Sequence, residues 1–130
     1  MRSLRSHETI WSRALHCDLD VQVAPLVEAM NKIPGVETVS SCQGEPGKLS
    51  GKGEMGHVAF KLKGDWQALC SFCFVNLRNI FSDFIDDEVR VDIFCSTRPY
   101  AWINFRHEML ELVTGRMRGL ASASGRENAT

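Results

Sequence analysis

The segment VETVSSCQGEPGKLSGKGEMGHVAFKL, residues Val36–Leu62, contains two strand-like runs with a glycine-rich stretch between them. In the second run Val58, Phe60 and Leu62 alternate with small or polar residues. Side chains of a strand point alternately to opposite faces, so this pattern predicts a strand with one buried face. The stretch from Gln43 to Gly56 holds five glycines, a proline and two lysines, which predicts a mobile loop.

Upstream of this segment, apolar residues recur at helical spacing until Pro34-Gly35 ends the pattern. The residues of that stripe are Val23, Leu26, Val27, Met30 and Ile33. We expect Asp18 or Asp20 to cap this helix, whose first turn tolerates Pro25.

Downstream, a helix is predicted from Asp65, as its N-cap, to Ile80. Its apolar stripe consists of Trp66, Leu69, Cys70, Cys73, Phe74, Leu77 and Ile80, widened by Phe72 and Val75. Alternation then predicts strands over Glu88–Cys95 and Tyr100–Arg106, paired as a hairpin by the short turn between them. A last helix is expected over His107–Val113.

This order of elements predicts an α+β fold: a two-layer sandwich with a mostly antiparallel sheet of about four strands and helices on one face. The single domain is expected to span residues 18–113. Residues 1–17 are interpreted as an N-terminal extension, and residues 114–130, which are small and polar, as a disordered tail.

Composition excludes several classes of protein. The chain has 130 residues and a net charge of −1, which argues against bulk electrostatic attraction to nucleic acid but leaves a local basic patch open. No apolar run reaches the roughly 18–20 residues that a membrane span needs. Five cysteines, an odd number, and the lack of a secretory leader favour reduced thiols in a cytoplasmic protein.

The end of the first strand carries small and polar residues where a core strand would stay apolar. These residues are Ser40, Ser41, Cys42, Gln43 and Gly44. Short side chains leave backbone amides accessible, and a glycine permits a positive φ, so this strand end could form a donor-rich cradle for a ligand. The alternative is that the serines cap the strand and Gly44 makes a tight turn.

Cys42 and His57 are the candidate catalytic residues. A nucleophilic thiol needs a neighbouring base, and His57 lies close to Cys42 if the two strands pair across the loop. The alternative is that Cys42 fills the strand end. Cys70 and Cys73, spaced as in redox and zinc sites, lie in an apolar helical stripe and are interpreted as core residues, so no metal site is predicted.

The last predicted strand places Trp102 and Arg106 on the face opposite its apolar residues. The same face holds Tyr100 and Asn104, and from the preceding strand Arg90, Asp92 and Phe94. Aromatic, amide and guanidinium groups together are suited to stacking and hydrogen-bonding a planar ligand. The alternative is that a helix or the N-terminal segment covers this face and buries Trp102.

The block PLVEAMNKIPGVETVSSCQGEPG…GHVAFKL resembles one found in small uncharacterised bacterial and phage proteins with a Ser-Cys-Gln-Gly motif. More remotely, it is similar to the tRNA wybutosine-synthesis methyltransferase family, whose hallmark is a Ser-Ser-Cys-Ser-Gly segment at the same strand end. The resemblance implies an α+β fold and S-adenosylmethionine as a cofactor. It also implies that Ser40, Ser41, Cys42 and Gly44 line a ligand pocket, with His57 beside it. Gln43 and Glu45 depart from that family's serine and arginine.

Two functional hypotheses follow. In the first, the strand end binds a small molecule, nucleoside-like or S-adenosylmethionine-like, in a role related to RNA base modification, with His57 as acid or base. In the second, the protein is a non-enzymatic bacterial or phage interaction module that binds another protein through its aromatic strand or a sheet edge.

Overall fold

A computed structural model describes residues 8–12, 17–44, 55–94 and 97–129 of the chain. The first elements are strands β1 (Thr9–Ser12) and β2 (Cys17–Asp20), helix α1 (Ala24–Asn31), and strands β3 (Val36–Cys42) and β4 (Gly56–Leu62). A continuous helical segment follows as α2 (Trp66–Ser71), η1 (Phe72–Leu77) and α3 (Arg78–Ile80). Strands β5 (Val89–Phe94) and β6 (Tyr100–Phe105), the short η2 (His107–Met109) and helix α4 (Leu110–Ala129) complete the described elements.

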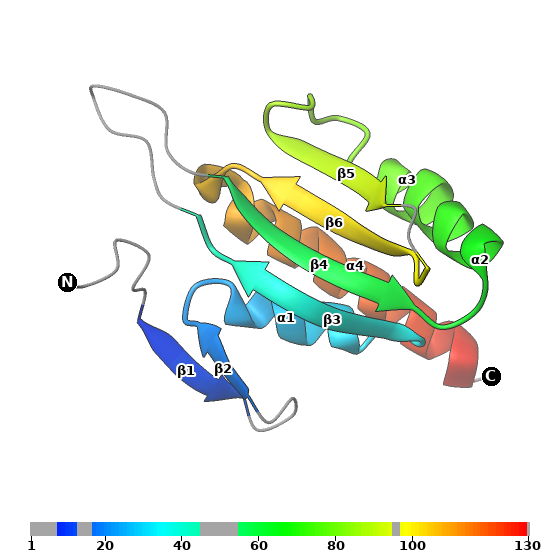
Figure 1. Ribbon diagram of the computed structural model, residues 1–130, viewed down its shortest axis with the longest axis horizontal. Coiled ribbons are helices and arrows are strands. Elements are labelled where there is room, and N and C mark those ends of the chain that lie inside the picture. Colours follow the sequence, from blue (N-terminus) through cyan, green and yellow to red (C-terminus); the bar gives the residue numbers. More distant parts are fainter. Residues whose placement is uncertain (1–7, 13–16, 45–54, 95–96, 130) are drawn as a thin grey trace.

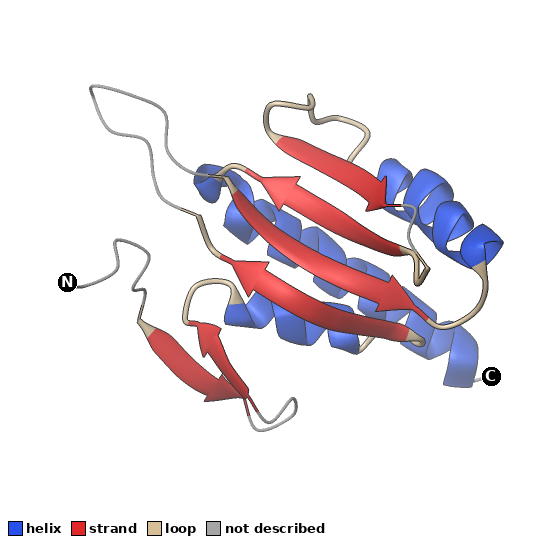
Figure 2. Cartoon of the chain, in the orientation of Figure 1, coloured by secondary structure: helices blue, strands red, loops and turns tan. Residues whose placement is uncertain are grey.

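Four of the strands form one antiparallel sheet in the order β3-β4-β6-β5, and β1 and β2 form a separate hairpin. Helices α1 and α4 cross behind the sheet in Figure 1, and Figure 2 shows the same two layers by type of element. The chain is therefore an α+β protein with helices on one face of an antiparallel sheet, as the sequence predicts. The β5–β6 hairpin is also confirmed.

The core lies between the sheet and the helices. The alternating strand residues Val58, Phe60, Ala101, Ile103 and Phe105 are fully buried and meet apolar residues of the helices. From α1 these are Leu26, Val27 and Met30, from the α2–α3 segment Leu69, Phe72 and Leu77, and from α4 Val113 and Met117. One face of β4 and β6 therefore packs in the core, and the alternate residues of both strands point away from the helices.

Helix α1 begins differently from the prediction. Its N-cap residue is Val23, without a side-chain cap, so the capping role expected for Asp18 or Asp20 is wrong. The Asp20 carboxylate instead accepts a hydrogen bond from the amide of Gln43, 3.3 Å away. Pro25 does lie in the first turn, where its missing N–H costs no helical hydrogen bond.

The helix after β4 starts as predicted, because Asp65 Oδ1 accepts a hydrogen bond from the amide of Ala68 at 2.9 Å. From Phe72 to Leu77, however, it winds as a π-helix. Leu69, Cys73 and Leu77 are buried as predicted. Phe74 and Val75, expected in or beside the apolar stripe, are 60% and 53% exposed, because they lie off the line through those three residues.

Both ends of the chain contain more regular structure than expected. Residues 9–12 and 17–20 pair as β1 and β2, within the predicted N-terminal extension and at its edge. The helix expected to stop at Val113 continues to Ala129, so the disordered tail is wrong for residues 114–129. Val113, Met117 and Ala121 recur every four residues and are buried, which holds this helix on the core. None of the described helices is long and apolar enough to cross a membrane.

Candidate ligand-binding face of the sheet

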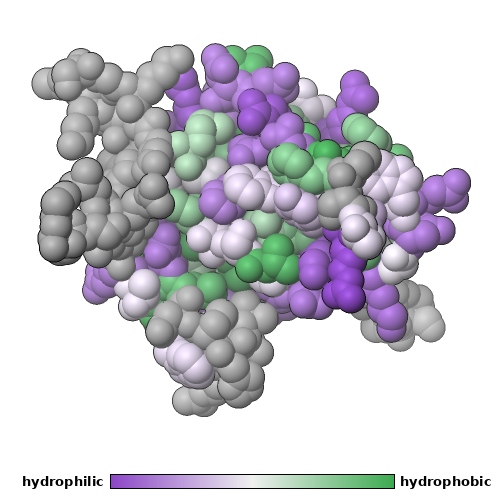
Figure 3. Space-filling model, viewed as in Figure 1, coloured by the Kyte–Doolittle hydropathy of each residue, from purple (hydrophilic) through white to green (hydrophobic). Residues whose placement is uncertain are grey.

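The face of the four-stranded sheet that points away from the helices carries the candidate site. We call it the open face, because no helix of the described residues lies on it. Strand alternation places His57 and Ala59 of β4 there, with Trp102 and Asn104 of β6. Arg90, Asp92 and Phe94 of β5 join them. The open face faces the viewer in Figure 3, where green and pale residues lie among hydrophilic ones.

Four rings form a connected group on the open face, here named the aromatic group: His57, Trp102, Phe94 and Tyr100. The His57 and Trp102 rings are stacked, with centroids 4.2 Å apart and planes at 15°. Phe94 meets the edge of Trp102 at 5.8 Å and stacks on Tyr100 at 5.0 Å. The group spans strands β4, β6 and β5, so three strands fix its geometry.

His57 and Trp102 meet because of the strand register. His57 stands opposite Asn104 and Ala59 opposite Trp102, so the two rings are diagonal neighbours on adjacent strands. The small Ala59 leaves room for the indole. Partial burial lowers the pKa of His57 below its ordinary value of 6.5. The imidazole is therefore neutral at neutral pH and can both stack and exchange a proton.

Polar groups adjoin the aromatic group. Asn104 is buried and its Nδ2 donates to Asp92 Oδ2 at 2.8 Å, while Arg90 Nε donates to the same oxygen at 2.9 Å. The indole Nε1 of Trp102 is buried and has no hydrogen-bond partner among the described residues. An unpaired buried donor costs on the order of 1–3 kcal/mol.

The predicted strand-end residues occupy ordinary strand positions. Ser40, Ser41 and Cys42 pair with Ala59, Val58 and His57 of β4, after a register shift between Thr38 and Ser40. Paired residues of adjacent strands point to the same face, so Ser40 and Cys42 lie on the open face with Ala59 and His57. Ser41 lies on the core face with Val58. The strand thus continues through these residues, and their role as a ligand cradle stays a prediction.

Gln43 and Gly44 are buried just past the strand end. The Gln43 side chain accepts a hydrogen bond from the amide of Gln22 at 3.0 Å, and its carbonyl oxygen lies 3.0 Å from His107 Nδ1. Gly44 has a φ of 78°, a conformation that favours glycine. The structure therefore gives both residues a structural task, joining β3 to the start of α1 and to η2.

A cavity of about 680 Å³ adjoins the contacts of Gln43. It is lined from the N-terminal side of α1 by Gln22 and Pro25, and from η2 and α4 by residues that include His107, Glu111 and Arg118. Sequence patterns single out none of the last three, because they belong to a region predicted as a short helix and a tail. Gln43 touches the lining of this cavity without lining it.

Cys42 and His57 stand directly opposite each other on β3 and β4, as expected if the strands pair across the loop. The structure describes both side chains and shows no hydrogen bond between them. The thiolate–imidazolium pair that activates a cysteine nucleophile is therefore not formed in this geometry. What the arrangement does provide is a small, half-buried thiol beside a neutral imidazole.

Arg106 directly follows β6 and is exposed, and its amide donates to the carbonyl of Glu88. By alternation it follows Trp102 and Asn104 along the open face, but no contact joins it to the aromatic group. Cys73 packs in the core, and burial together with Cys70 raises the pKa of its thiol to about 12. That thiol is protonated at neutral pH, which agrees with the packing role predicted for it.

The fold and this face define a two-layer α+β protein whose sheet presents an aromatic surface on its helix-free side. No protein-family model, no curated protein and no solved structure matches the chain. The resemblance to the wybutosine-synthesis methyltransferase family therefore stays a prediction.

Proposed function

We propose that the open face binds a small molecule with a planar, nucleobase-like ring, such as a nucleoside or S-adenosylmethionine. The observation that carries the proposal is the His57–Trp102 stack on a sheet face that no described helix covers. Stacking a base on an aromatic side chain contributes about 1–3 kcal/mol, and every base offers a flat surface for it. The sequence hypothesis of a nucleoside-like ligand is thus kept, with the ligand moved from the strand end to the adjoining face.

Hydrogen-bonding groups next to the rings would orient the base. The Asp92 carboxylate accepts hydrogen bonds, as an exocyclic amino group requires, whereas the Asn104 amide nitrogen already donates to Asp92 and to the carbonyl of Arg90. Adenine has such an amino group and, unlike guanine and cytosine, no carbonyl oxygen that needs a donor. An adenine-containing ligand therefore fits this surface best.

Charge favours a small ligand over a long nucleic acid. Binding to a nucleic-acid backbone depends on many Lys and Arg contacts, whereas this chain has a net charge of −1. On the open face Arg90 is paired with Asp92 and so is not free to neutralise a phosphate. If a group-transfer step follows binding, His57 presents a neutral imidazole that can accept a proton, because burial lowers its pKa below 6.5.

Calorimetric titration with adenosine, guanosine and S-adenosylmethionine tests the proposal. We expect saturable heat with an adenine-containing ligand for the wild type. Trp102→Ala should weaken that binding by about 1–3 kcal/mol, the contribution of one stacked base. Trp102→Phe, which keeps an aromatic ring but removes the indole N–H, should retain most of it.

Trp66→Ala is the matched control, since Trp66 is partly exposed on α2, in the helix layer. Equal loss of binding in Trp66→Ala and Trp102→Ala would contradict the proposal, as would the absence of heat with all three ligands. The second result, combined with weaker capture of a protein partner by Trp102→Ala, would instead support the interaction module.

A further inference from the structure

The two edges of the four-stranded sheet are protected to very different degrees. Edge strand β3 is interrupted by a register shift, and Asn31 of α1 exchanges hydrogen bonds with the amide and hydroxyl of Thr38. Asp20 of β2 accepts from Gln43, just beyond the end of β3. Edge strand β5 pairs with β6 without a shift over its whole length, and no described strand lies on its other side. A regular, unprotected edge is a template for pairing with another strand.

The register shows which backbone groups of β5 point outward. Arg106 N donates to Glu88 O at 2.9 Å, so residues 88 and 106 are a hydrogen-bonded pair. Because such pairs alternate along an antiparallel ladder, the N–H and C=O groups of Arg90 and Asp92 point to β6. Those of Val89, Val91 and Ile93 point away from the sheet. Of these amides, that of Val89 donates to the carbonyl of Ile85 at 3.1 Å.

The sequence of β5 is self-complementary. If two copies of Val89-Arg-Val-Asp-Ile93 pair antiparallel about Val91, each Val91 stands opposite Val91 of the other copy. Arg90 then stands opposite Asp92, and Asp92 opposite Arg90, on the open face. Val89 meets Ile93 on the core face. Opposite charges and apolar side chains are thus matched at every position of the pair.

The space beside β5 suits this arrangement. On the core face a cavity of about 660 Å³ separates β5 from η1 and α3, lined by Val91 and Ile93 and, across from them, by Phe74 and Phe81. The apolar residues of a second β5 would enter the open side of this space. Phe74, 60% exposed in the single chain, lies where such residues would cover it.

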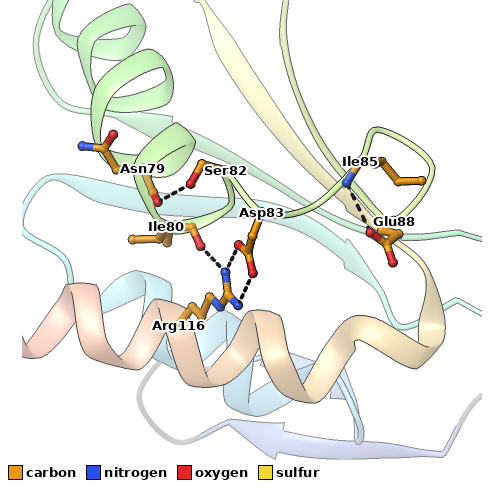
Figure 4. Close-up of polar contacts among 7 residues, drawn as sticks. All are labelled: Asn79, Ile80, Ser82, Asp83, Ile85, Glu88 and Arg116. Carbon is orange, nitrogen blue, oxygen red and sulfur yellow. Dashed lines mark hydrogen bonds and ion pairs between the residues drawn. The ribbon is translucent and has the colours of Figure 1, made fainter.

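The segment that precedes β5 is held on the helix layer (Figure 4). Arg116 of α4 donates to both carboxylate oxygens of Asp83, and its Nη1 also donates to the carbonyl of Ile80 at 2.7 Å. Glu88 accepts from the amide of Ile85 at 3.2 Å. These contacts tie residues 80–88 to α4 and to one another. Among the outward-pointing amides of β5, only that of Val89 has a hydrogen-bond partner within the described residues.

We propose that β5 pairs with β5 of a second copy of this chain, giving a two-fold symmetric dimer with one continuous eight-stranded sheet. The pairing is centred on Val91, and the ion pair between Arg90 and Asp92 within one strand is exchanged for two such pairs between strands. Both helix layers then lie on the same side, and both open faces on the other. This inference does not depend on what the open face binds.

Reversal of charge tests the register. Sedimentation equilibrium of the full chain should give a wild-type species of about twice 14.6 kDa. Arg90→Asp or Asp92→Arg alone places like charges opposite each other and should raise the dissociation constant at least tenfold. The double variant Arg90→Asp/Asp92→Arg restores opposite charges and should dimerise again.

A mixture of the two single variants tests the register most directly. One chain then carries two acids and the other two arginines, so the mixture should form a heterodimer although each variant alone is monomeric. Lys63→Asp, the same change of charge on an exposed residue outside β5, is the control and should leave the dimer intact. Circular dichroism confirms folding of each variant.

A wild-type chain that is monomeric at every concentration would overturn the proposal. So would a dimer that tolerates Arg90→Asp and Asp92→Arg as well as it tolerates Lys63→Asp. A monomer that carries an unrelated peptide, detected by native mass spectrometry, would assign the edge to another protein and would equally overturn pairing between copies.

Discussion

At the scale of single residues, His57 and Trp102 determine what the open face can do. Their stacked rings contribute about 0.5–1.5 kcal/mol beyond the area they bury. The same packing removes water from the imidazole, which lowers its pKa. Stability and protonation are therefore coupled at this residue.

The coupling predicts a dependence of stability on pH. The pKa of His57 is lower in the folded chain than in the unfolded chain, so the unfolded chain binds more protons just below pH 6.5. The free energy of unfolding that His57 contributes is thus complete above pH 6.5 and is lost as the pH falls through the folded-state pKa. His57→Phe keeps a ring but cannot titrate.

Urea unfolding between pH 7.5 and pH 4.5, ~0.5 pH unit apart, compares the two proteins. The wild type should lose more stability than His57→Phe on acidification, because the remaining histidines and carboxyl groups are common to both. Parallel curves would show that burial does not disfavour the charged imidazole.

The residue composition of the site could be predicted only in part. Alternation along β6 correctly predicts that Trp102 faces away from the core, and strand pairing correctly predicts that Cys42 lies opposite His57. The stack of His57 on Trp102 depends on the register between β4 and β6, which a single sequence does not specify. His107 could not be found either, since its contact with Gln43 joins residues far apart in the chain.

At the scale of elements, Gly56 determines how closely β3, β4 and β6 can approach. A Cβ atom at this position would lie 2.4 Å from the Phe105 ring and 2.8 Å from the carbonyl oxygen of Cys42. Phe105 is fully buried and the Cys42 carbonyl is fixed in a strand, so neither can move away from an added Cβ atom. The glycine is therefore required by packing at the start of β4.

Gly56→Ala should destabilise the chain by about 1–3 kcal/mol, the cost of overpacking a well-packed core. Gly115→Ala is the matched control, because nothing lies within 4 Å of a Cβ atom placed there on α4. Alanine favours the helix, so this variant should be stabilised by about 0.5–1 kcal/mol. Equal urea midpoints for the two variants would contradict the packing assigned to Gly56.

The elements themselves were largely predictable from hydrophobic period. Strands β5 and β6 lie within one residue of their predicted ends, Glu88–Cys95 and Tyr100–Arg106, since period-two alternation is clear in both. The π-helical turns of η1 could not be predicted, because the same apolar residues also fit a regular helix. The length of α4 was missed because its exposed residues, among them Gly115 and Gly119, are typical of loops, whereas packing on α1 decides the outcome.

At the scale of the whole molecule, the two layers place the packed core on one face of the sheet and the proposed binding surface on the other. The helix layer buries one face of the sheet, which leaves the open face and the β5 edge as the surfaces that need a further explanation. A ligand on the open face and a second chain on the β5 edge would both use Asp92, and would otherwise use different surfaces of the same sheet. The central claim concerns the first of these.

Chemical-shift mapping with adenosine tests that claim most directly, because each amide reports on its own surroundings. We predict that the shifted resonances cluster at His57, Trp102 and Phe94 and include the indole N–H of Trp102. Shifts confined to residues around the cavity beside Gln22 and His107, or no shifts at saturating adenosine, would contradict it.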